Sequence, residues 1–309
     1  MNLLKTPKQI DLLWVFGVAS FIRTAEHPMN TSRNIALVIN PLHQTALCVG
    51  NQITQLLQQK EIAHQIFTTS WPSHFTDFTE AWVVGGDGTL NYFINQYPLF
   101  DLPIAIYKGG TGNDFHWMLY GESSLPQQVE LVLAATPKAV DAGYCNNHLF
   151  LNGIGIGFDG KVVQDLLGKK KWTGKMSYLK VVLMNILFFS EFVCTVSNGA
   201  FNWGKKCLMI TVANGKRYGG GFTVNPDGLV DDQLLDISII GKINPFLRIG
   251  LLSAIGKGTH VTLPMVTYLK SGGIHIKAGK IVPAHADGEY FDASEFVIEC
   301  LPGRFSFLY

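Results

Sequence analysis

Two glycine-rich segments carry the residue types that bind phosphate groups. Residues 85–91 read GGDGTLN and residues 109–115 read GGTGNDF, and each follows a hydrophobic run. Consecutive glycines let backbone N–H groups approach a phosphate chain closely, and a helix that begins after the loop favours negative charge at its N-terminus. A carboxylate beside phosphates is repulsive unless a cation lies between them. Asp87 therefore predicts Mg²⁺, held directly or through water.

Each segment also has a simpler explanation. An ordinary turn needs one or two glycines, whereas residues 85–91 also place an acid, a hydroxyl and an amide in order. Helix capping alone would account for Asn113 and Asp114. Ligands of open α/β sheets bind outside the carboxyl ends of the strands, so both segments should line one crevice. Their shared location favours the phosphate-binding interpretation.

A chain of 309 residues that is 47% hydrophobic is long enough for two domains. The order of predicted strands and helices differs between its two halves, which also indicates two domains. We expect an N-terminal extension over residues 1–32, an α/β domain over 33–138 and a β-rich domain over 139–309. Buried strands are predicted at 35–39, 63–68, 81–84 and 103–106, with helical spacing between. β-prone runs at 148–152, 208–212, 234–240, 261–269 and 296–299 follow, with helical inserts at 161–167, 175–189 and 244–255.

Charge and cysteine usage exclude several classes of protein. A formal net charge of +1 lacks the basic excess of a nucleic-acid-binding protein. The five cysteines are scattered and form no CxxC pair, which indicates neither a disulfide framework nor a zinc site and fits a reducing cytoplasm.

Two stretches raise the question of membrane contact. Residues 10–22 are apolar but too short for a spanning helix, which leaves a packing extension, an interfacial anchor or a cleaved signal. Lys169, Lys170, Lys171, Trp172 and Lys175 form a basic run with one aromatic ring. Such a run suits anionic headgroups, although a solvated helix end has the same composition.

Further motifs accompany the two glycine segments in a fixed order. They are NGIGIGFD at 152–159, GGGF at 219–222, DDQLLD at 231–236 and DGE at 287–289. Together the motifs resemble the diacylglycerol kinase catalytic-domain family of lipid kinases, which includes bacterial members and the sphingosine and ceramide kinases. The resemblance implies a NAD kinase-like α/β domain and a β-sandwich-like C-terminal domain, with the active site in the cleft between them.

The resemblance also implies roles for individual residues. ATP and Mg²⁺ would serve transfer of the γ-phosphate to a lipid hydroxyl, with Glu289 as general base. Asp87, Asp114 and Asp232 would organise Mg²⁺, and Asp232 would form a metal site with the backbone carbonyls of Leu229 and Leu234. The nucleotide would be bound by Asn40, Thr69, Gly85, Gly86, Asp87, Gly88, Thr89, Leu90, Asn91, Gly110, Thr111 and Asn113.

The implied setting is a cytoplasmic enzyme that contacts the membrane surface transiently to reach a membrane lipid, without a nucleic-acid partner. Diacylglycerol is the family's usual acceptor, and a homodimer is left open. Departures from the family pattern occur at Leu42-His43-Gln44, where a small Ser-Gly turn is typical, at Tyr92 in place of Glu, and at Gln233 in place of Gly. They keep two alternatives open, a NAD kinase-like enzyme and an inactive lipid- or nucleotide-binding regulator.

Overall fold

The computed structural model describes residues 33–167 and 175–309, with the side chains of 175–179 excluded. The N-terminal extension and residues 168–174, which include Lys169, Lys170, Lys171 and Trp172 of the basic run, therefore lie outside the described residues. Among the described residues, none of the helices has both the length and the apolar character needed to cross a membrane.

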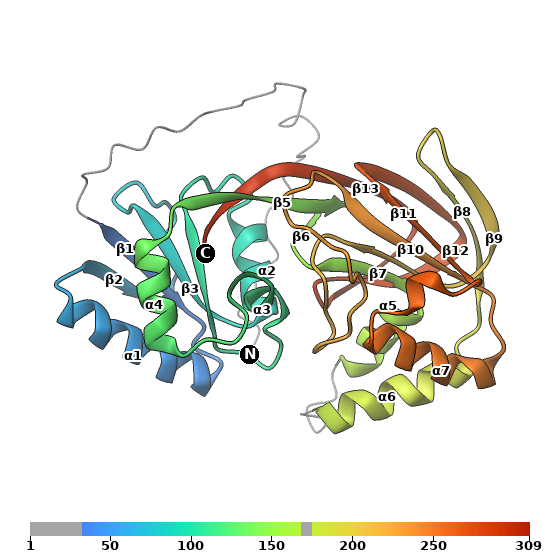
Figure 1. The fold of residues 1–309 in the computed structure, drawn as a ribbon, viewed down its shortest axis with the longest axis horizontal. Helices are drawn as coiled ribbons and strands as arrows, with labels where there is room; N and C mark the ends of the chain where they lie inside the picture. Colours follow the sequence, from blue (N-terminus) through green and yellow to red (C-terminus); the bar gives the residue numbers. More distant parts are fainter. Residues whose placement is uncertain (1–32, 168–174) are drawn as a thin grey trace.

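The first half is a four-stranded parallel sheet covered by helices on both faces. The strand order is β2-β1-β3-β4, and Figure 1 shows α1 and α4 on one side and α2 and α3 on the side toward the second half. The elements are β1 (Asn34–Ile39), α1 (Gln44–Gln59), β2 (Ala63–Phe67), β3 (Glu80–Gly85), α2 (Asp87–Gln96), β4 (Ile104–Lys108), α3 (Asp114–Tyr120) and α4 (Leu125–Ala134).

The continuous apolar runs form strands here because both faces of the sheet are buried. Ala36 and Val38 pack with α2 and α3, whereas Leu37 packs with α1 and α4. The buried positions of α1 recur every three or four residues, which turns one stripe of the helix to the sheet. The α/β prediction is confirmed, including all four strands.

The second half is built from antiparallel strands that curl around a core. β7 and β8 each pair with β9 and with β12, and three helices cover the outer face. The elements are β5 (Pro137–Cys145), β6 (His148–Phe150), β7 (Gly153–Gly157), α5 (Phe158–Leu166), α6 (Lys175–Phe188), β8 (Phe192–Ser197), β9 (Asn202–Ala213), β10 (Leu235–Gly241), α7 (Pro245–Gly256), the 3₁₀ turn η2 (His260–Thr262), β11 (Val266–Ser271), β12 (Gly273–Ala286) and β13 (Glu289–Leu308). The β-sandwich-like prediction and the three helical inserts are confirmed.

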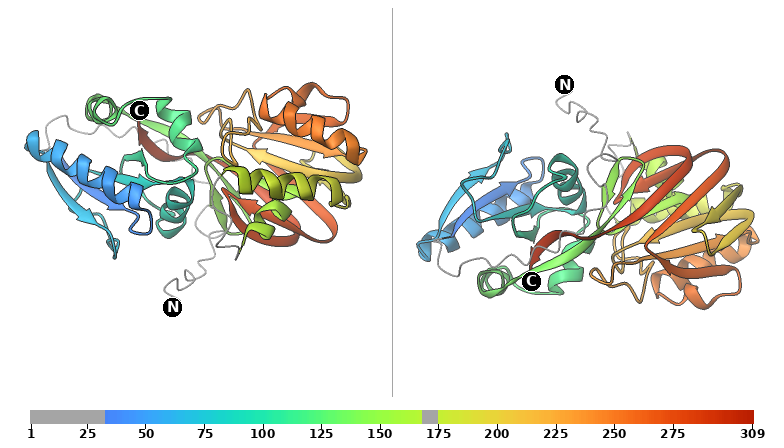
Figure 2. Two further views of the ribbon diagram at one scale, coloured as in Figure 1. Left: turned by 90° about the horizontal axis from the view of Figure 1, so that it is seen from below. Right: turned by 90° about the horizontal axis from the view of Figure 1, so that it is seen from above.

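Two long strands join the halves. β5 and β13 pair with each other and run from the β-rich half into the α/β half, where the C-terminus lies (Figures 1 and 2). There Phe307 pairs in parallel with Ile104, and Val140 and Phe305 enter the α/β core. The predicted boundary at residue 138 falls inside β5, so both halves share one continuous sheet.

One predicted strand is shorter than expected. The run at 261–269 begins as the 3₁₀ turn η2, and strand β11 starts only at Val266. Pro264 explains the difference, because its ring restricts Leu263 and proline has no N–H to donate to a ladder.

Candidate active site

The carboxylate of Asp87 fastens the two glycine loops together. Asp87 begins α2, and its two carboxylate oxygens accept the backbone N–H groups of Asp114 and Phe115, at 2.9 and 3.0 Å. Asp87 thereby caps the N-terminus of α3. The loops touch so closely that a Cβ on Gly110 would lie 2.5 Å from the Gly86 Cα. Both glycines are required by this contact.

Two predicted nucleotide-binding residues lie at the ends of neighbouring strands. Asn40 follows β1, and its amide donates to the Thr89 hydroxyl at 2.7 Å. Thr69 follows β2 and is exposed. Val38 of β1 pairs with Phe67 of β2, so the residues two positions further on, Asn40 and Thr69, lie at the same level of the sheet. Asn40, Thr69 and the loop at Thr89 therefore all lie at the carboxyl edge of the sheet.

Asp114 is buried and ion-paired with the second half of the protein. One carboxylate oxygen lies 2.9 Å from Arg217 Nε, and the other accepts the Gly220 N–H at 2.9 Å. The Arg217 guanidinium also stacks 3.7 Å above the Trp117 ring. Motif reasoning assigned Asp114 to a metal and missed Arg217. Arg217 lies two residues before the GGGF segment, and this position was the sequence feature that could have identified it.

Asp287 crosslinks the halves at the DGE turn. Its carboxylate accepts the backbone N–H groups of Leu151, Asn152 and Gly153 at 2.8 to 2.9 Å. The Asn91 amide donates to Asp287 and to the Leu149 carbonyl, so this predicted nucleotide ligand is committed to the interface. Sequence reasoning did not identify this role of Asp287.

Glu289 is held next to the first glycine loop. A Cβ on Gly88 would lie 3.6 Å from Glu289 Oε1, which places the carboxylate against the first turn of α2. Burial, followed by the negative charge of Asp287, raises the pKa of Glu289 above its ordinary value. A raised pKa suits a carboxylate that accepts a proton near neutral pH.

A buried cluster of His285, Asp159 and Tyr218 supports the turn that precedes Glu289. The Gly288 N–H donates to His285 Nδ1 at 3.2 Å, so the ring proton lies on Nε2, which is 3.2 Å from Asp159 Oδ2. The Tyr218 hydroxyl donates to the same oxygen at 2.6 Å. Asp159, from the NGIGIGFD motif, thus orients the DGE turn through His285.

The predicted metal ligands do not converge in the described residues. Asp232 lies 2.9 Å from Lys270 Nζ and accepts the Leu234 N–H, while Leu229 is half exposed. No group of three His, Cys, Asp or Glu side chains within residues 33–167 and 175–309 is arranged to hold a metal ion. Asp87, Asp114 and Asp232 each bind protein donors, so these residues do not fit a protein-enclosed magnesium site.

The departures from the family pattern have structural counterparts. Gln233 adopts a φ of 65°, the left-handed conformation that explains why glycine is usual at this position. His43 provides no side-chain cap to α1, and Leu42 is exposed. Tyr92 packs edge-on against Trp71 on the outer side of α2. None of these substitutions removes Asp87, Asp114 or Glu289 from its place.

The buried carboxyl of Asp87 predicts a specific pH dependence of stability. Burial outweighs the two amide hydrogen bonds and raises its pKa from 3.8 to about 6. Between these values the folded state binds more protons than the unfolded state, so the free energy of unfolding falls as pH rises through this window. The expected fall is roughly 3 kcal/mol. Denaturant titrations of wild type and Asp87→Asn from pH 3.5 to 7 test this, since the variant lacks the titrating group. Equal slopes in the two proteins would contradict it.

The sequence matches two family descriptions that together cover most of the described residues. Residues 34–145 match "Diacylglycerol kinase catalytic domain", and residues 152–309 match "YegS C-terminal NAD kinase beta sandwich-like domain". Curated relatives named "Probable lipid kinase YegS-like" include one from Pseudomonas savastanoi pv. phaseolicola that is 30% identical over 228 residues, covering 71% of this chain and 72% of the relative. Another from Stenotrophomonas maltophilia is 28% identical, covering 71% and 75%.

Solved structures show the same fold. A diacylglycerol kinase from Bacillus anthracis superposes with a TM-score of 0.71 at 23% identity, covering 91% of this chain and 98% of its own. A NAD kinase from Archaeoglobus fulgidus in complex with ATP superposes with a TM-score of 0.52 at 17% identity, covering 89% and 93%. The two-domain architecture predicted from the motifs is therefore shared with both groups.

Proposed function

Because this chain belongs to the diacylglycerol kinase-like family that includes the YegS-like proteins, we propose that it is a lipid kinase that transfers the γ-phosphate of ATP to a lipid hydroxyl. Diacylglycerol is the acceptor that we expect. The enzyme would work in the cytoplasm and contact the membrane surface peripherally while it takes up its substrate.

The observation that carries this proposal is the position of Glu289 beside the glycine loops. The lipid hydroxyl must lose its proton when it attacks the γ-phosphorus, and a carboxylate within hydrogen-bond reach can accept it. Glu289 faces Gly88 at the start of α2. The N-terminus of α2 begins at this loop, and a helix N-terminus favours a phosphate chain, whereas the first amides of α3 are bound by Asp87. The base and the phosphate-binding loops thus meet where the two halves join.

Magnesium enters this proposal as part of the nucleotide substrate. Mg²⁺ keeps several waters and commonly binds substrate phosphates with only one or two carboxylates. Asp87 retains lone pairs beyond its two amide hydrogen bonds and is the carboxylate in the loop, so it could accept a hydrogen bond from a metal-bound water. The chemistry that Mg²⁺ supplies is neutralisation of phosphate charge.

The alternative of a NAD kinase is less well supported. The relatives reported above are named lipid kinases, and the NAD kinase superposes less closely than the diacylglycerol kinase. The shared fold alone does not distinguish the acceptors.

Phosphate transfer from labelled ATP provides the test. Purified protein with Mg²⁺ is expected to label diacylglycerol in mixed micelles and to leave NAD⁺ unlabelled. Asp87→Asn is expected to lower the labelling of diacylglycerol. Asp77→Asn is the matched control, because Asp77 is an exposed acid outside the glycine loops, and it should leave the labelling unchanged. Labelling of NAD⁺ alone would overturn the proposal. So would binding of ATP, seen as a thermal shift, without labelling of any extracted lipid.

A further inference from the structure

The ammonium group of Lys270, on β11, lies close to three oxygen atoms. Lys270 Nζ is 2.9 Å from Asp232 Oδ2 and 3.5 Å from Asp236 Oδ2. The same group donates to the backbone carbonyl of Asp227 at 3.4 Å. A lysine ammonium group has three N–H donors and no acceptor, so three oxygens are the partners that it can use. Two carboxylates and a carbonyl are also the kind of oxygen atoms that bind a divalent cation.

Strand pairing brings the lysine to one of these carboxylates. β10 and β11 are antiparallel, and Asp236 pairs directly with Lys270. Directly opposed residues carry their side chains on the same face of the sheet, with Cβ atoms about 5 Å apart. Tyr268 lies two residues earlier on β11, and its hydroxyl donates to Asp236 Oδ1. The other oxygen of this carboxylate is the one that faces the ammonium group.

The carboxylate of Asp236 needs a cation beside it. Its side chain is only 1% exposed, and its Oδ2 accepts no hydrogen bond within the described part of the chain. A buried carboxylate oxygen without a donor is costly unless a positive charge compensates it. The second carboxylate, that of Asp232, adds like-charge repulsion at short range. The ammonium group of Lys270 is placed to offset both effects.

A metal ion and the ammonium group would compete for the same oxygen. The resemblance to the lipid kinase family assigns a metal ion to Asp232, but its Oδ2 is directed at Lys270 Nζ. Mg²⁺ binds oxygen at about 2.0–2.1 Å and Ca²⁺ at about 2.3–2.6 Å. An ion on the same side of Oδ2 would therefore overlap Nζ at 2.9 Å, and its charge would be repelled.

The segment that Lys270 holds supports the junction between the two halves. Val230 lies in this segment and packs in the core of the α/β half. Asp141 of β5 accepts the Gln233 N–H at 2.6 Å and the Gly303 N–H at 2.7 Å. A cation that fixes both ends of the segment, at residues 227 and 236, therefore stabilises the contact with β5 and β13.

We propose that the Lys270 ammonium group takes the place of a divalent cation in this chain, so that the junction between the halves is stable without a metal ion. The inference does not rest on the proposed kinase function. Mg²⁺ would then enter the reaction with the nucleotide and would not be a structural ion of the β-rich half. Removal of the ammonium group should leave carboxylates that respond to a divalent cation.

The wild-type protein provides the first test. Without nucleotide, its melting temperature in EDTA and in Ca²⁺ or Mg²⁺ should agree within about 1 °C, because a ligand stabilises a protein only where it binds the folded state. Elemental analysis after gel filtration should find no stoichiometric divalent cation. A clearly lower melting temperature in EDTA, or one retained Ca²⁺ or Mg²⁺ per chain, would overturn the proposal.

The second test removes the ammonium group. Ca²⁺ is the probe, because it tolerates irregular sets of oxygen ligands. In EDTA, Lys270→Ser is expected to melt about 4 °C below the wild type, and Ca²⁺ should recover most of this difference with half-saturation at roughly 1 mM. Lys270→Arg keeps the positive charge and should stay insensitive to Ca²⁺. The double variant with Lys270→Ser and Asp232→Asn should lose the Ca²⁺ response.

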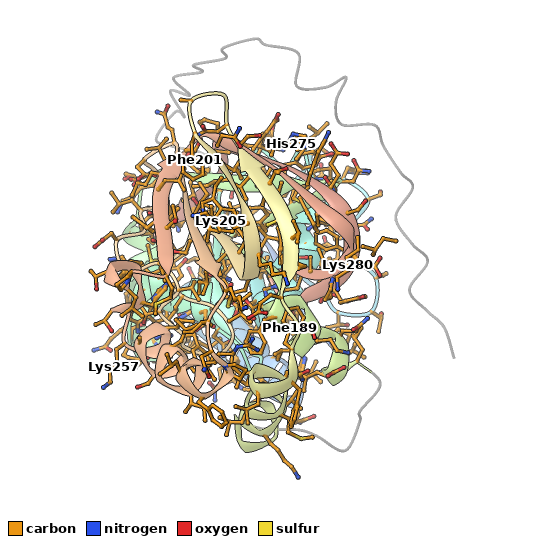
Figure 3. All side chains as sticks on the ribbon, turned by 90° about the vertical axis from the view of Figure 1, so that its right-hand side faces the viewer. Phe189, Phe201, Lys205, Lys257, His275 and Lys280 are labelled. Atoms are coloured by element: carbon orange, nitrogen blue, oxygen red, sulfur yellow. The ribbon has the colours of Figure 1, made fainter. Side chains whose placement is uncertain are left out.

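A surface lysine on another strand supplies the matched control. Lys277 lies 3.2 Å from Glu295 and is 59% exposed. Glu295 also pairs with His275, which Figure 3 shows near the upper end of the strands of this half. Both basic residues belong to β12, which is not a neighbour of β11 in the sheet. Lys277→Ser also removes a lysine beside an acid, and it should melt at the same temperature with and without Ca²⁺.

The outcome of the second test is decisive in either direction. A Lys270→Ser protein that is destabilised but unaffected by Ca²⁺ would overturn the proposal, and so would an equal Ca²⁺ response in Lys277→Ser. If Lys270→Ser does not fold in EDTA, refolding in Ca²⁺ should recover the wild-type circular dichroism spectrum. Failure to recover it would show that the lysine does not stand in for a divalent cation.

Discussion

Glu289→Gln is expected to lower kcat for lipid phosphorylation by about 10²- to 10⁴-fold, the usual contribution of a general base. Glutamine has nearly the same shape but cannot accept the proton of the attacking hydroxyl. KM for ATP should change little, because the Glu289 side chain lies against Gly88 without bonding the loops. Steady-state rates with purified variants measure both constants.

A matched control lies on the same strand. Glu295 of β13 is exposed and pairs with His275 and Lys277, so Glu295→Gln removes a carboxylate of the same hairpin without touching the candidate site. Its kcat should equal that of the wild type. Activity of Glu289→Gln within a factor of three of the wild type would contradict the assignment of the base.

The pH profile provides a second measure of the same role. Burial and Asp287 raise the pKa of Glu289, so the acidic limb of kcat/KM should lie above the ordinary range of a glutamate. Residual activity of Glu289→Gln should lose this limb. A profile that keeps the same limb in the variant would assign the titration to another group.

Much of the fold follows from local patterns in the sequence. Short uninterrupted apolar runs can be buried only where both faces of a strand are covered, which identifies a parallel sheet. Glycine segments directly after two such runs then have to meet at one edge, as Gly86 and Gly110 do. Asn40 and Asp87 lie at this edge for the same reason, whereas Glu289 of β13 was predicted only from the family resemblance.

Long-range pairing could not be predicted in the same way. Phe307 pairs with Ile104, and nothing in the local residue pattern of either strand specifies the other. The misjudged start of β11 has a local cause, because the apolar run was given more weight than Pro264. Non-local pairings depend on which strand edges remain open once the other elements have packed.

The binding partners of the acidic residues also could not be predicted from the sequence. An aspartate of a motif can bind a metal, a cation or backbone N–H groups, and the type of residue does not distinguish these. Asp232 pairs with Lys270, and Asp287 binds three successive amides. Of the acids that were predicted to organise Mg²⁺, Asp87 and Asp114 bind amides of other segments and Asp232 pairs with Lys270.

The ion pair between Asp114 and Arg217 should therefore have a large effect on stability. Asp114 is almost fully buried and Arg217 is 23% exposed, and the pair joins α3 to the second half. Removing one partner of a buried pair leaves an uncompensated charge, which typically costs 3–5 kcal/mol. For Asp114→Asn we expect about 3 kcal/mol, because Arg217 retains some contact with water.

A double-mutant cycle distinguishes this pair from independent contributions. Arg217→Met keeps an apolar chain over Trp117 and removes the charge, so each single variant leaves one unpaired group whereas the double variant leaves none. The double variant carries both Asp114→Asn and Arg217→Met. Its loss of unfolding free energy should be smaller than the sum of the losses in the two single variants, by at least about 1 kcal/mol. Denaturant titration measures the cycle, and lipid kinase assays of the same proteins report whether α3 and the glycine loop keep their position. Strictly additive losses would show that Asp114 and Arg217 do not stabilise the protein as a pair.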